Sequence, residues 1–162
     1  MKTIIDHICC PLHRYTLSVK PIRKWVEDHC EGSVLNLFAG VTRLNVDEIR
    51  NDIDLRADAD FHLEPVTFLD NWSGSPFDTI LLDPLSAYRN EIELALKVVH
   101  DPLRSLKDAL VKHLKPAGKV ITFGYHTIVM GQSRGFELEK IGVFSHGGVS
   151  HDTIASVERF QF

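Results

Sequence analysis

The chain has 162 residues, 44% of them hydrophobic and 25% charged, and its formal net charge is -4 at pH 7. This length and composition are typical of one globular domain with a real hydrophobic core. They exclude a membrane-spanning chain, since no apolar run approaches about 18 residues, and the negative charge argues against broad attachment to duplex nucleic acid.

The residues near the start of the chain favour a cytosolic protein. Asp6 and His7 follow Met1 before any signal-like apolar segment develops. The three cysteines are an odd number without CxxC spacing, which favours reduced thiols over disulfides. Neither these cysteines nor the histidines near them match a zinc template, so we expect no metal site.

The first predicted element is a helix from Ser18 to Cys30. Its first residue can cap it, Pro21 suits the first turn, and apolar residues recur on one face at helical spacing. We therefore expect a single domain, residues 1–162, in which an N-terminal helical segment (1–32) precedes a core of residues 33–162.

Short apolar runs then predict seven strands. They are Ser33 to Phe38, Asp47 to Ile53, Val66 to Leu69, Phe77 to Leu82, Lys119 to Gly124, Phe136 to Ser145 and Thr153 to Phe162. A helix from about Asp101 to Leu114 precedes the fifth strand, and the Gly147-Gly148 turn joins the last two as an antiparallel hairpin. Strands of this kind with helices between some of them predict an α/β fold with a mostly parallel sheet.

Two connections are too short for the usual crossover. Only eleven residues separate Gly40 from Asp52, whereas a parallel crossover needs about a dozen or more and usually contains a helix. The segment between Leu69 and Phe77 has room only for a loop. We therefore expect a fold trimmed of some of its crossover helices.

Chemistry-bearing residues follow three predicted strands, where open α/β sheets bind ligands. Gly40 ends the first strand and lets the backbone approach a ligand closely, although a purely structural glycine turn is at least as common. Asp52 ends the second and suits the hydroxyls of a ribose, its alternative being a solvated acid. Asp83 and Pro84 end the fourth strand.

Together these segments resemble the class I S-adenosylmethionine-dependent methyltransferases, and among them the amino-group (adenine N6 or cytosine N4) nucleic-acid methylases. Leu35 to Thr42 is similar to their L-D-x-F-A-G-x-T loop, and Leu114 to Val120 to their L-K-P-G-G-x-V segment. Asp52-Ile53-Asp54 resembles their acid motif, and Asp83-Pro84-Leu85-Ser86 stands where they carry D-P-P-Y. The resemblance runs from about Tyr15 to Phe162 and implies a Rossmann-like fold.

The resemblance implies a methyltransferase that uses S-adenosyl-L-methionine. Phe38 to Gly40 would pass under the methionine part, Asp52 would hold the ribose, Ile53 would pack on the adenine and Glu64 would bind its amino group. The full set of implied cofactor contacts is Tyr15, Lys20, Asn36, Phe38, Ala39, Gly40, Thr42, Asp52, Ile53 and Glu64. Asp83 and the Pro84 region would accept hydrogen bonds from the substrate amine, so that catalysis is largely positioning and needs no metal.

The sequence departs from that family's pattern in the catalytic loop. Leu85 and Ser86 replace the second proline and the aromatic residue that would stack on a flipped base. Tyr88 is a candidate catalytic replacement, and packing against a neighbouring helix is an equally good reading of it. This departure keeps two alternatives open, a cofactor-binding or regulatory module without activity and a small-molecule methyltransferase. A nicotinamide site is disfavoured because a G-x-G-x-x-G loop is absent.

The sequence indicates only the general kinds of partner that this chain would have. A chain of this length leaves no room for a target-recognition domain, so DNA or RNA specificity would come from short loops, a specificity subunit or a second copy of the chain. Residues 125–134, which follow the fifth strand, are a candidate substrate loop.

Overall fold

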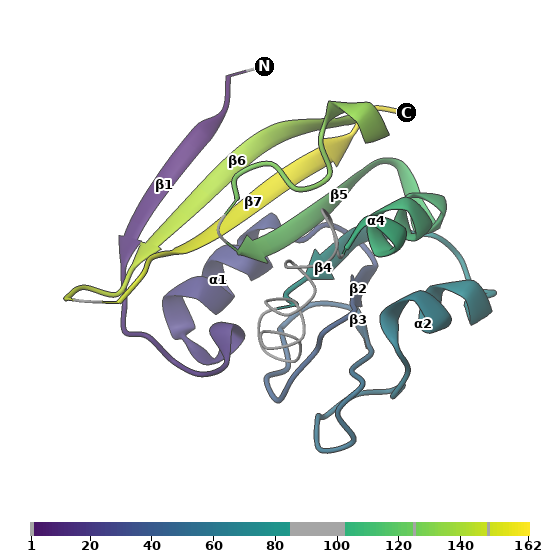
Figure 1. Cartoon of the computed structure of the whole chain (residues 1–162), viewed down its shortest axis with the longest axis horizontal. Coiled ribbons are helices and arrows are strands. Elements are labelled where there is room, and N and C mark those ends of the chain that lie inside the picture. The colour runs from purple at the N-terminus through teal and green to yellow at the C-terminus, as the bar shows by residue number, and fades with distance from the viewer. Residues whose placement is uncertain (1, 85–102, 125, 149) are drawn as a thin grey trace.

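The computed structural model describes residues 2–84, 103–124, 126–148 and 150–162. Within these ranges the strands form one seven-stranded sheet in the order β1-β6-β7-β5-β4-β2-β3 (Figure 1). The strands are β1 (Ile4–Cys9), β2 (Val34–Asn36), β3 (Glu48–Arg50), β4 (Phe77–Leu82), β5 (Leu114–Gly124), β6 (Phe136–Ser145) and β7 (Thr153–Phe160). Pairing is parallel except that β7 runs antiparallel to both β5 and β6.

Helices cover both faces of the sheet. Helix α1 (Lys20–His29) lies on one face, where it buries Ile22 and Val26 in a cluster with Val34 and Leu81 (Figure 1). Helices α2 (Pro65–Asn71) and α4 (Arg104–Leu110) lie on the other face, in a second cluster that contains Leu35. Three short 3-10 helices complete the described elements, η1 (Thr16–Ser18), η2 (Val111–His113) and η3 (Gln132–Arg134).

Several predictions from the sequence are confirmed. The bounds of β4 and β6 are those expected, the predicted first helix is α1, and the last two strands form the antiparallel hairpin. Residues 37–47, which connect β2 to β3 and are all described, contain no helix, as their number required. The fold is the expected mostly parallel α/β sheet with few crossover helices.

The strand predicted at Val66 to Leu69 is wrong, because these residues belong to helix α2. The carboxylate of Glu64 caps this helix by accepting hydrogen bonds from the Thr67 N–H and hydroxyl, at 3.0 and 3.2 Å, and Pro65 occupies its first turn. A capping acid followed by proline starts a helix, and tertiary packing of Phe68 and Leu69 overrides the β-branched residues beside them.

The expectation that residues 1–32 are helical is also wrong in part. Residues Ile4–Cys9 form strand β1, which pairs in parallel with β6 at the edge of the sheet. This strand replaces the mispredicted one in the count of seven. Its outer residues Ile4 and Ile5 are more than half exposed, so it lacks the continuous apolar run of a buried strand.

Strand direction gathers the candidate residues at one edge of the sheet. Strands β2, β3 and β4 run parallel to one another, so their carboxyl ends meet on the same side. Gly40 follows β2, Asp52 follows β3, and Asp83 follows β4 directly. No helix in the described part of the chain is long and apolar enough to cross a membrane.

Candidate functional site

The centre of the site is a hydrogen bond between the two loops that follow β2 and β3. The Gly40 N–H donates to Asp52 Oδ2 at 2.8 Å, and the Asp54 N–H donates to Asp52 Oδ1 at 2.9 Å. Asp52 is only 3% exposed. These two hydrogen bonds fix the orientation of the Asp52 carboxylate, so the loops hold a positioned pair of acceptor oxygens at the strand ends.

A pocket of about 130 Å³ opens beside this carboxylate. Its lining comes from the segment before η1 and from both strand-end loops, namely Tyr15, Gly40, Val41, Asp52, Asp54, Arg56 and Ala57. The volume is below the roughly 300–1,000 Å³ of a typical small-molecule site. This pocket is therefore too small to enclose a whole small-molecule ligand of typical size.

Gly40 leaves space in this pocket that another residue would fill. Its φ is +61°, in the left-handed region, and a Cβ built on it meets no atom within 4 Å. Gly40 also lines the pocket, so a side chain at this position would occupy open space beside it. The glycine thus serves both a backbone conformation and a close approach.

The pocket rim carries an ion pair that the sequence prediction missed. Arg56 donates from Nη2 to Asp54 Oδ2 at 2.8 Å and from Nε to Asp54 Oδ1 at 3.0 Å. These hydrogen bonds lower the pKa of Asp54 to about 2, so Asp54 is charged at neutral pH. The i, i+2 spacing of opposite charges was the one available signal for this pair.

The structure brings some of the predicted cofactor residues together. Tyr15, Gly40 and Asp52 share the pocket, and Phe38 and Ala39 are buried in the loop that leads to Gly40. Thr42 belongs to the same loop, and its hydroxyl hydrogen-bonds to Ser18 Oγ at 2.7 Å. Ile53 is 45% exposed beside Asp52 and presents an apolar surface there.

Other predicted residues lie outside this pocket lining. Glu64 is exposed and uses its carboxylate to cap α2. Asn36 is fully buried in β2, where its Nδ2 donates to Glu48 Oε2 at 3.2 Å. Lys20 belongs to the surface of α1. These placements give each of the three a setting other than the pocket around Asp52.

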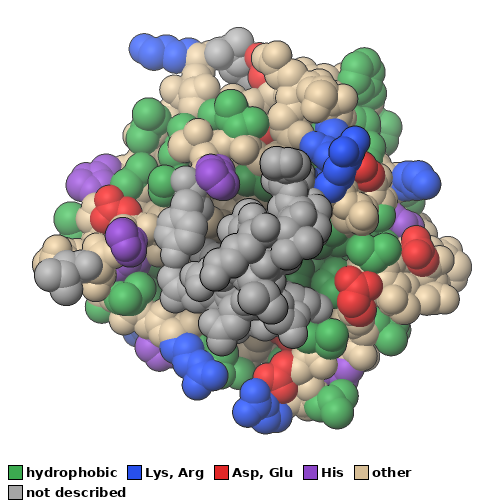
Figure 2. Space-filling view, viewed as in Figure 1, with side chains coloured by type: hydrophobic (Ala, Val, Ile, Leu, Met, Phe, Trp, Pro, Cys, Tyr) green, Lys and Arg blue, Asp and Glu red, His purple; other side chains and the backbone are tan. Residues whose placement is uncertain are grey.

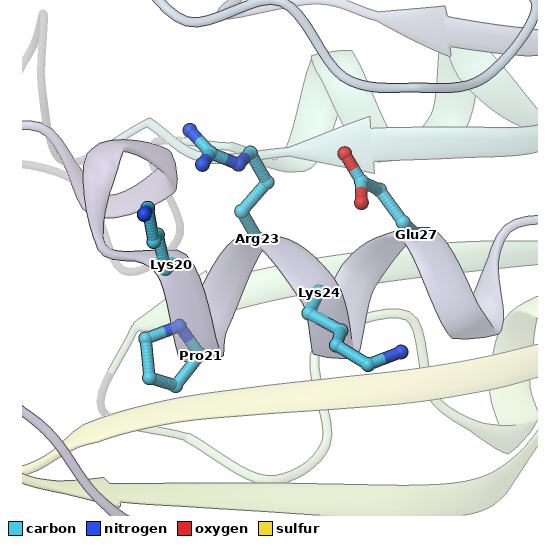
Figure 3. A pocket seen from close by; sticks show the side chains of 5 residues that line it. All are labelled: Lys20, Pro21, Arg23, Lys24 and Glu27. Carbon is cyan, nitrogen blue, oxygen red and sulfur yellow. The ribbon is translucent and has the colours of Figure 1, made fainter.

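A larger pocket, of about 580 Å³, runs along α1 and contains Lys20. Its lining among the described residues is Lys20, Pro21, Arg23, Lys24 and Glu27, all on α1, and Figure 3 shows their side chains spread along that helix (Figure 3). Lys24 is paired with Asp28 at 3.0 Å, and the Glu27 carboxylate accepts a hydrogen bond from the Asn45 N–H. Because its described lining comes from one helix, this groove encloses a ligand less well than the strand-end pocket does.

The predicted catalytic residues lie at the end of β4. Asp83 and Pro84 are both buried, and Asp83 is 4% exposed. Strand β4 pairs with β2, so Asp83 extends the strand edge that carries Gly40 and Asp52. Tyr88, Leu85 and Ser86 lie outside the described residues.

The candidate substrate loop is described for residues 126–134. The buried carboxylate of Glu158, on β7, accepts hydrogen bonds from the N–H groups of Val129, Met130 and Gly131 at 2.8–2.9 Å. The loop therefore has a fixed path close to the sheet. Tyr125 lies outside the described residues.

Comparison with known proteins gives structural neighbours only. No family model and no curated protein matches the sequence. The N-methyltransferase NodS from Bradyrhizobium japonicum WM9 is similar with a TM-score of 0.58 and 11% identity, over 88% of this chain and 98% of that one. TrmN from Thermus thermophilus is similar with a TM-score of 0.59 and 15% identity over 88% of this chain. The match covers about half (49%) of TrmN.

A third neighbour is an rRNA methylase from Streptococcus thermophilus, with a TM-score of 0.51 and 11% identity over 86% of this chain and 94% of that one. The fold is a Rossmann-like fold similar to that of these methyltransferases. At such identities the likeness concerns the fold, and the function has to be argued from the site.

Proposed function

We propose that this chain is an S-adenosylmethionine-dependent methyltransferase that acts on an amino group of a nucleobase in DNA or RNA. The observation that carries the proposal is the Gly40–Asp52 pair beside an open pocket, at the strand ends where this fold class binds ligands. NodS, which has a similar fold, was also solved in complex with S-adenosyl-L-homocysteine.

The pocket residues suit the nucleoside part of this cofactor. A carboxylate oxygen offers two lone pairs, so each oxygen of Asp52 keeps acceptor capacity for a ribose hydroxyl beyond its one bond to the loop. Tyr15 and the exposed Ile53 supply flat and apolar surface for a base. Gly40 leaves room for close approach.

The acceptor end of the site lies at Asp83 and Pro84. The bound cofactor supplies an electrophilic methyl group on its sulfonium sulfur. The Asp83 carboxylate and a carbonyl of the Pro84 region would accept hydrogen bonds from the acceptor amine and orient its nitrogen lone pair. Positioning of this kind accounts for a large part of many enzymatic rate enhancements. NodS is described as an N-methyltransferase, which supports an amine acceptor.

The surface charge bears on how a nucleic acid would bind. On the face of the molecule that Figure 2 shows, lysine and arginine side chains are scattered among acidic ones over the described residues (Figure 2). With a net charge of -4, electrostatic attraction to phosphates is weak. We therefore propose that recognition relies on short loops such as residues 126–134, or on a specificity subunit or second copy.

A second candidate is a module that binds the cofactor without transferring its methyl group. Leu85 and Ser86 favour it, since they stand where the resembling enzymes carry a proline and an aromatic residue. A small-molecule acceptor is the remaining option for an active enzyme with the same altered loop.

The test is transfer of tritium from methyl-labelled cofactor into separate pools of DNA, RNA and small amines. We expect incorporation into a nucleic-acid pool and a loss of about 100-fold or more in Asp83→Ala, with cofactor binding retained. Asp70→Ala, which removes an exposed carboxylate from α2, is the matched control and should be as active as the wild type.

Each other outcome has a distinct meaning. Incorporation only into small amines would identify a small-molecule methyltransferase instead of a nucleic-acid methylase. Cofactor binding without transfer to any pool would support the module that binds the cofactor without transferring its methyl group. Equal activity of Asp83→Ala and wild type would remove Asp83 from the proposed mechanism.

A further inference from the structure

The loop that follows β2 lacks the helix that usually completes such a connection. Residues 37–47 form turns, bends and irregular backbone, with no helix or strand. Buried backbone carbonyls nevertheless need hydrogen-bond donors, which a helix would have supplied internally. Ala39 and neighbouring parts of this loop are buried, so their carbonyl groups must find donors elsewhere.

Arg50, the last residue of β3, supplies these donors from a fully buried position. Its Nη2 donates to the carbonyls of Ala39 at 3.1 Å and Gly40 at 3.2 Å, and its Nη1 donates to Thr42 O at 2.9 Å. Its Nε donates to Asp58 O at 2.6 Å, on the loop after β3.

The fifth partner of Arg50 is the Glu48 carboxylate, which lies 2.6 Å from Nη1 and is itself 4% exposed. A guanidinium has five N–H donors, and the five acceptors match that number. Glu48 also accepts from the Leu44 N–H at 3.0 Å and from Asn36. The buried charge is thus paired and fully hydrogen-bonded, the condition under which burial is tolerated.

This arrangement sets the direction of the loop amides. In a trans peptide the C=O and the following N–H point in opposite directions, and the described residues contain no cis peptide bond. Because the carbonyls of Ala39 and Gly40 face Arg50, the N–H groups of Gly40 and Val41 face away from it. The Gly40 N–H reaches Asp52, and no described group accepts from the Val41 N–H.

We propose that Arg50 is a positioning residue that holds the cofactor-binding loop, residues 37–42, in its binding conformation in place of the missing crossover helix. It acts through the backbone of Gly40 and so fixes Asp52 and the pocket lining, without touching the ligand itself. The role as a cofactor loop rests on the proposed function, whereas the clamp on the loop is independent of it.

Isothermal titration with S-adenosyl-L-homocysteine tests the role in binding. Lysine keeps the charge but has three donors and no planar fork, so Arg50→Lys should weaken binding about tenfold or more. The matched control is Arg43→Lys, because Arg43 bridges the same two loops through an exposed ion pair with Asp58. The affinity of the Arg43→Lys control should stay within about twofold of the wild-type affinity, because exposed ion pairs contribute little to stability.

A double variant separates positioning from stability. Glu48→Gln/Arg50→Met removes both buried charges together, so it leaves no unpaired ion and should fold. It nevertheless deprives the carbonyls of Ala39, Gly40 and Thr42 of their donors. We expect the double variant to unfold cooperatively, as a folded protein does, and to bind the ligand more weakly than the wild type. Binding equal to that of the wild type in a folded double variant would overturn the proposal.

Amide hydrogen exchange on the ligand-free chain keeps the proposal testable if the wild type does not bind the ligand. The Gly40 and Asp58 amides, which donate to Asp52 and to Gly40 O respectively, should exchange at least tenfold faster in Arg50→Lys and in the double variant. Amides of β4 and β5 should keep their protection. Unchanged exchange at Gly40 and Asp58 would disprove the clamp, whereas faster exchange without any ligand binding would refute only the proposed function.

Discussion

The N–H of Gly40 lies 2.8 Å from Asp52 Oδ2, and this one hydrogen bond ties together the ends of two parallel strands. It makes the carboxylate part of the loop structure and of the pocket wall at once. A substitution at either residue therefore changes both the conformation of the loop and the chemistry of the site.

Gly40→Ala should weaken cofactor binding strongly. The residue has φ +61° and its Cβ would enter the pocket, so we expect a loss of about 1–2 kcal/mol of unfolding free energy together with loss of S-adenosyl-L-homocysteine binding. Gly147→Ala is the control, because Gly147 has φ +74° and equally open surroundings in the β6–β7 turn. Urea unfolding and titration calorimetry give both quantities. Equal binding by the two variants would place the cofactor elsewhere.

Glu158→Gln should loosen the candidate substrate loop. The buried carboxylate accepts three backbone N–H groups, and the amide of glutamine would turn a donor toward at least one of them. We expect a loss of about 1–3 kcal/mol in the free energy of unfolding, measured in urea. The exposed Asp47→Asn should change stability by less than about 0.5 kcal/mol. A Glu158→Gln protein as stable as the wild type would contradict this account of the loop.

Asp78 should contribute to stability in a pH-dependent manner. Lys115 Nζ, 2.7 Å away, and the Ser33 N–H, 2.8 Å away, lower the pKa of its carboxyl. A lowered native pKa gives stability that is present above the unfolded value of about 3.9 and is lost as the pH falls through the native value.

The measurement is urea unfolding of wild type and Asp78→Asn between pH 7 and pH 2.5. The wild type should be the more stable above about pH 5, and the difference should narrow below about pH 4. Asp70→Asn should follow the wild type throughout. A constant difference between wild type and Asp78→Asn would show that the pKa shift does not contribute.

The sequence predicted those elements whose signal is local. Strand β4 ends in the buried apolar run Ile80-Leu81-Leu82, and β6 and β7 flank a glycine turn, so all three were found. Strand β1 exists only through pairing with residues 136 positions away, as Ile4 with Lys140 shows. Its half-exposed residues carry no periodic signal that would have predicted this.

For the site as well, features with a local sequence signal were predicted and those that depend on long-range contacts were not. Gly40 and Asp52 were expected at neighbouring strand ends and share one pocket. The role of Arg50 could not be predicted, because four of its five acceptors are backbone carbonyls that only the folded chain brings together. A charged residue inside a predicted strand was the only sign, and such residues usually face solvent.

Cofactor binding by the isolated chain is the most direct test of the central claim. Isothermal titration of the purified protein with S-adenosylmethionine should give micromolar affinity, about -8 kcal/mol. Asp52→Ala should abolish the signal, while Asp47→Ala, which removes an exposed carboxylate before β3, should leave it unchanged. Absence of binding in the wild type, or undiminished binding in Asp52→Ala, would contradict the proposed site.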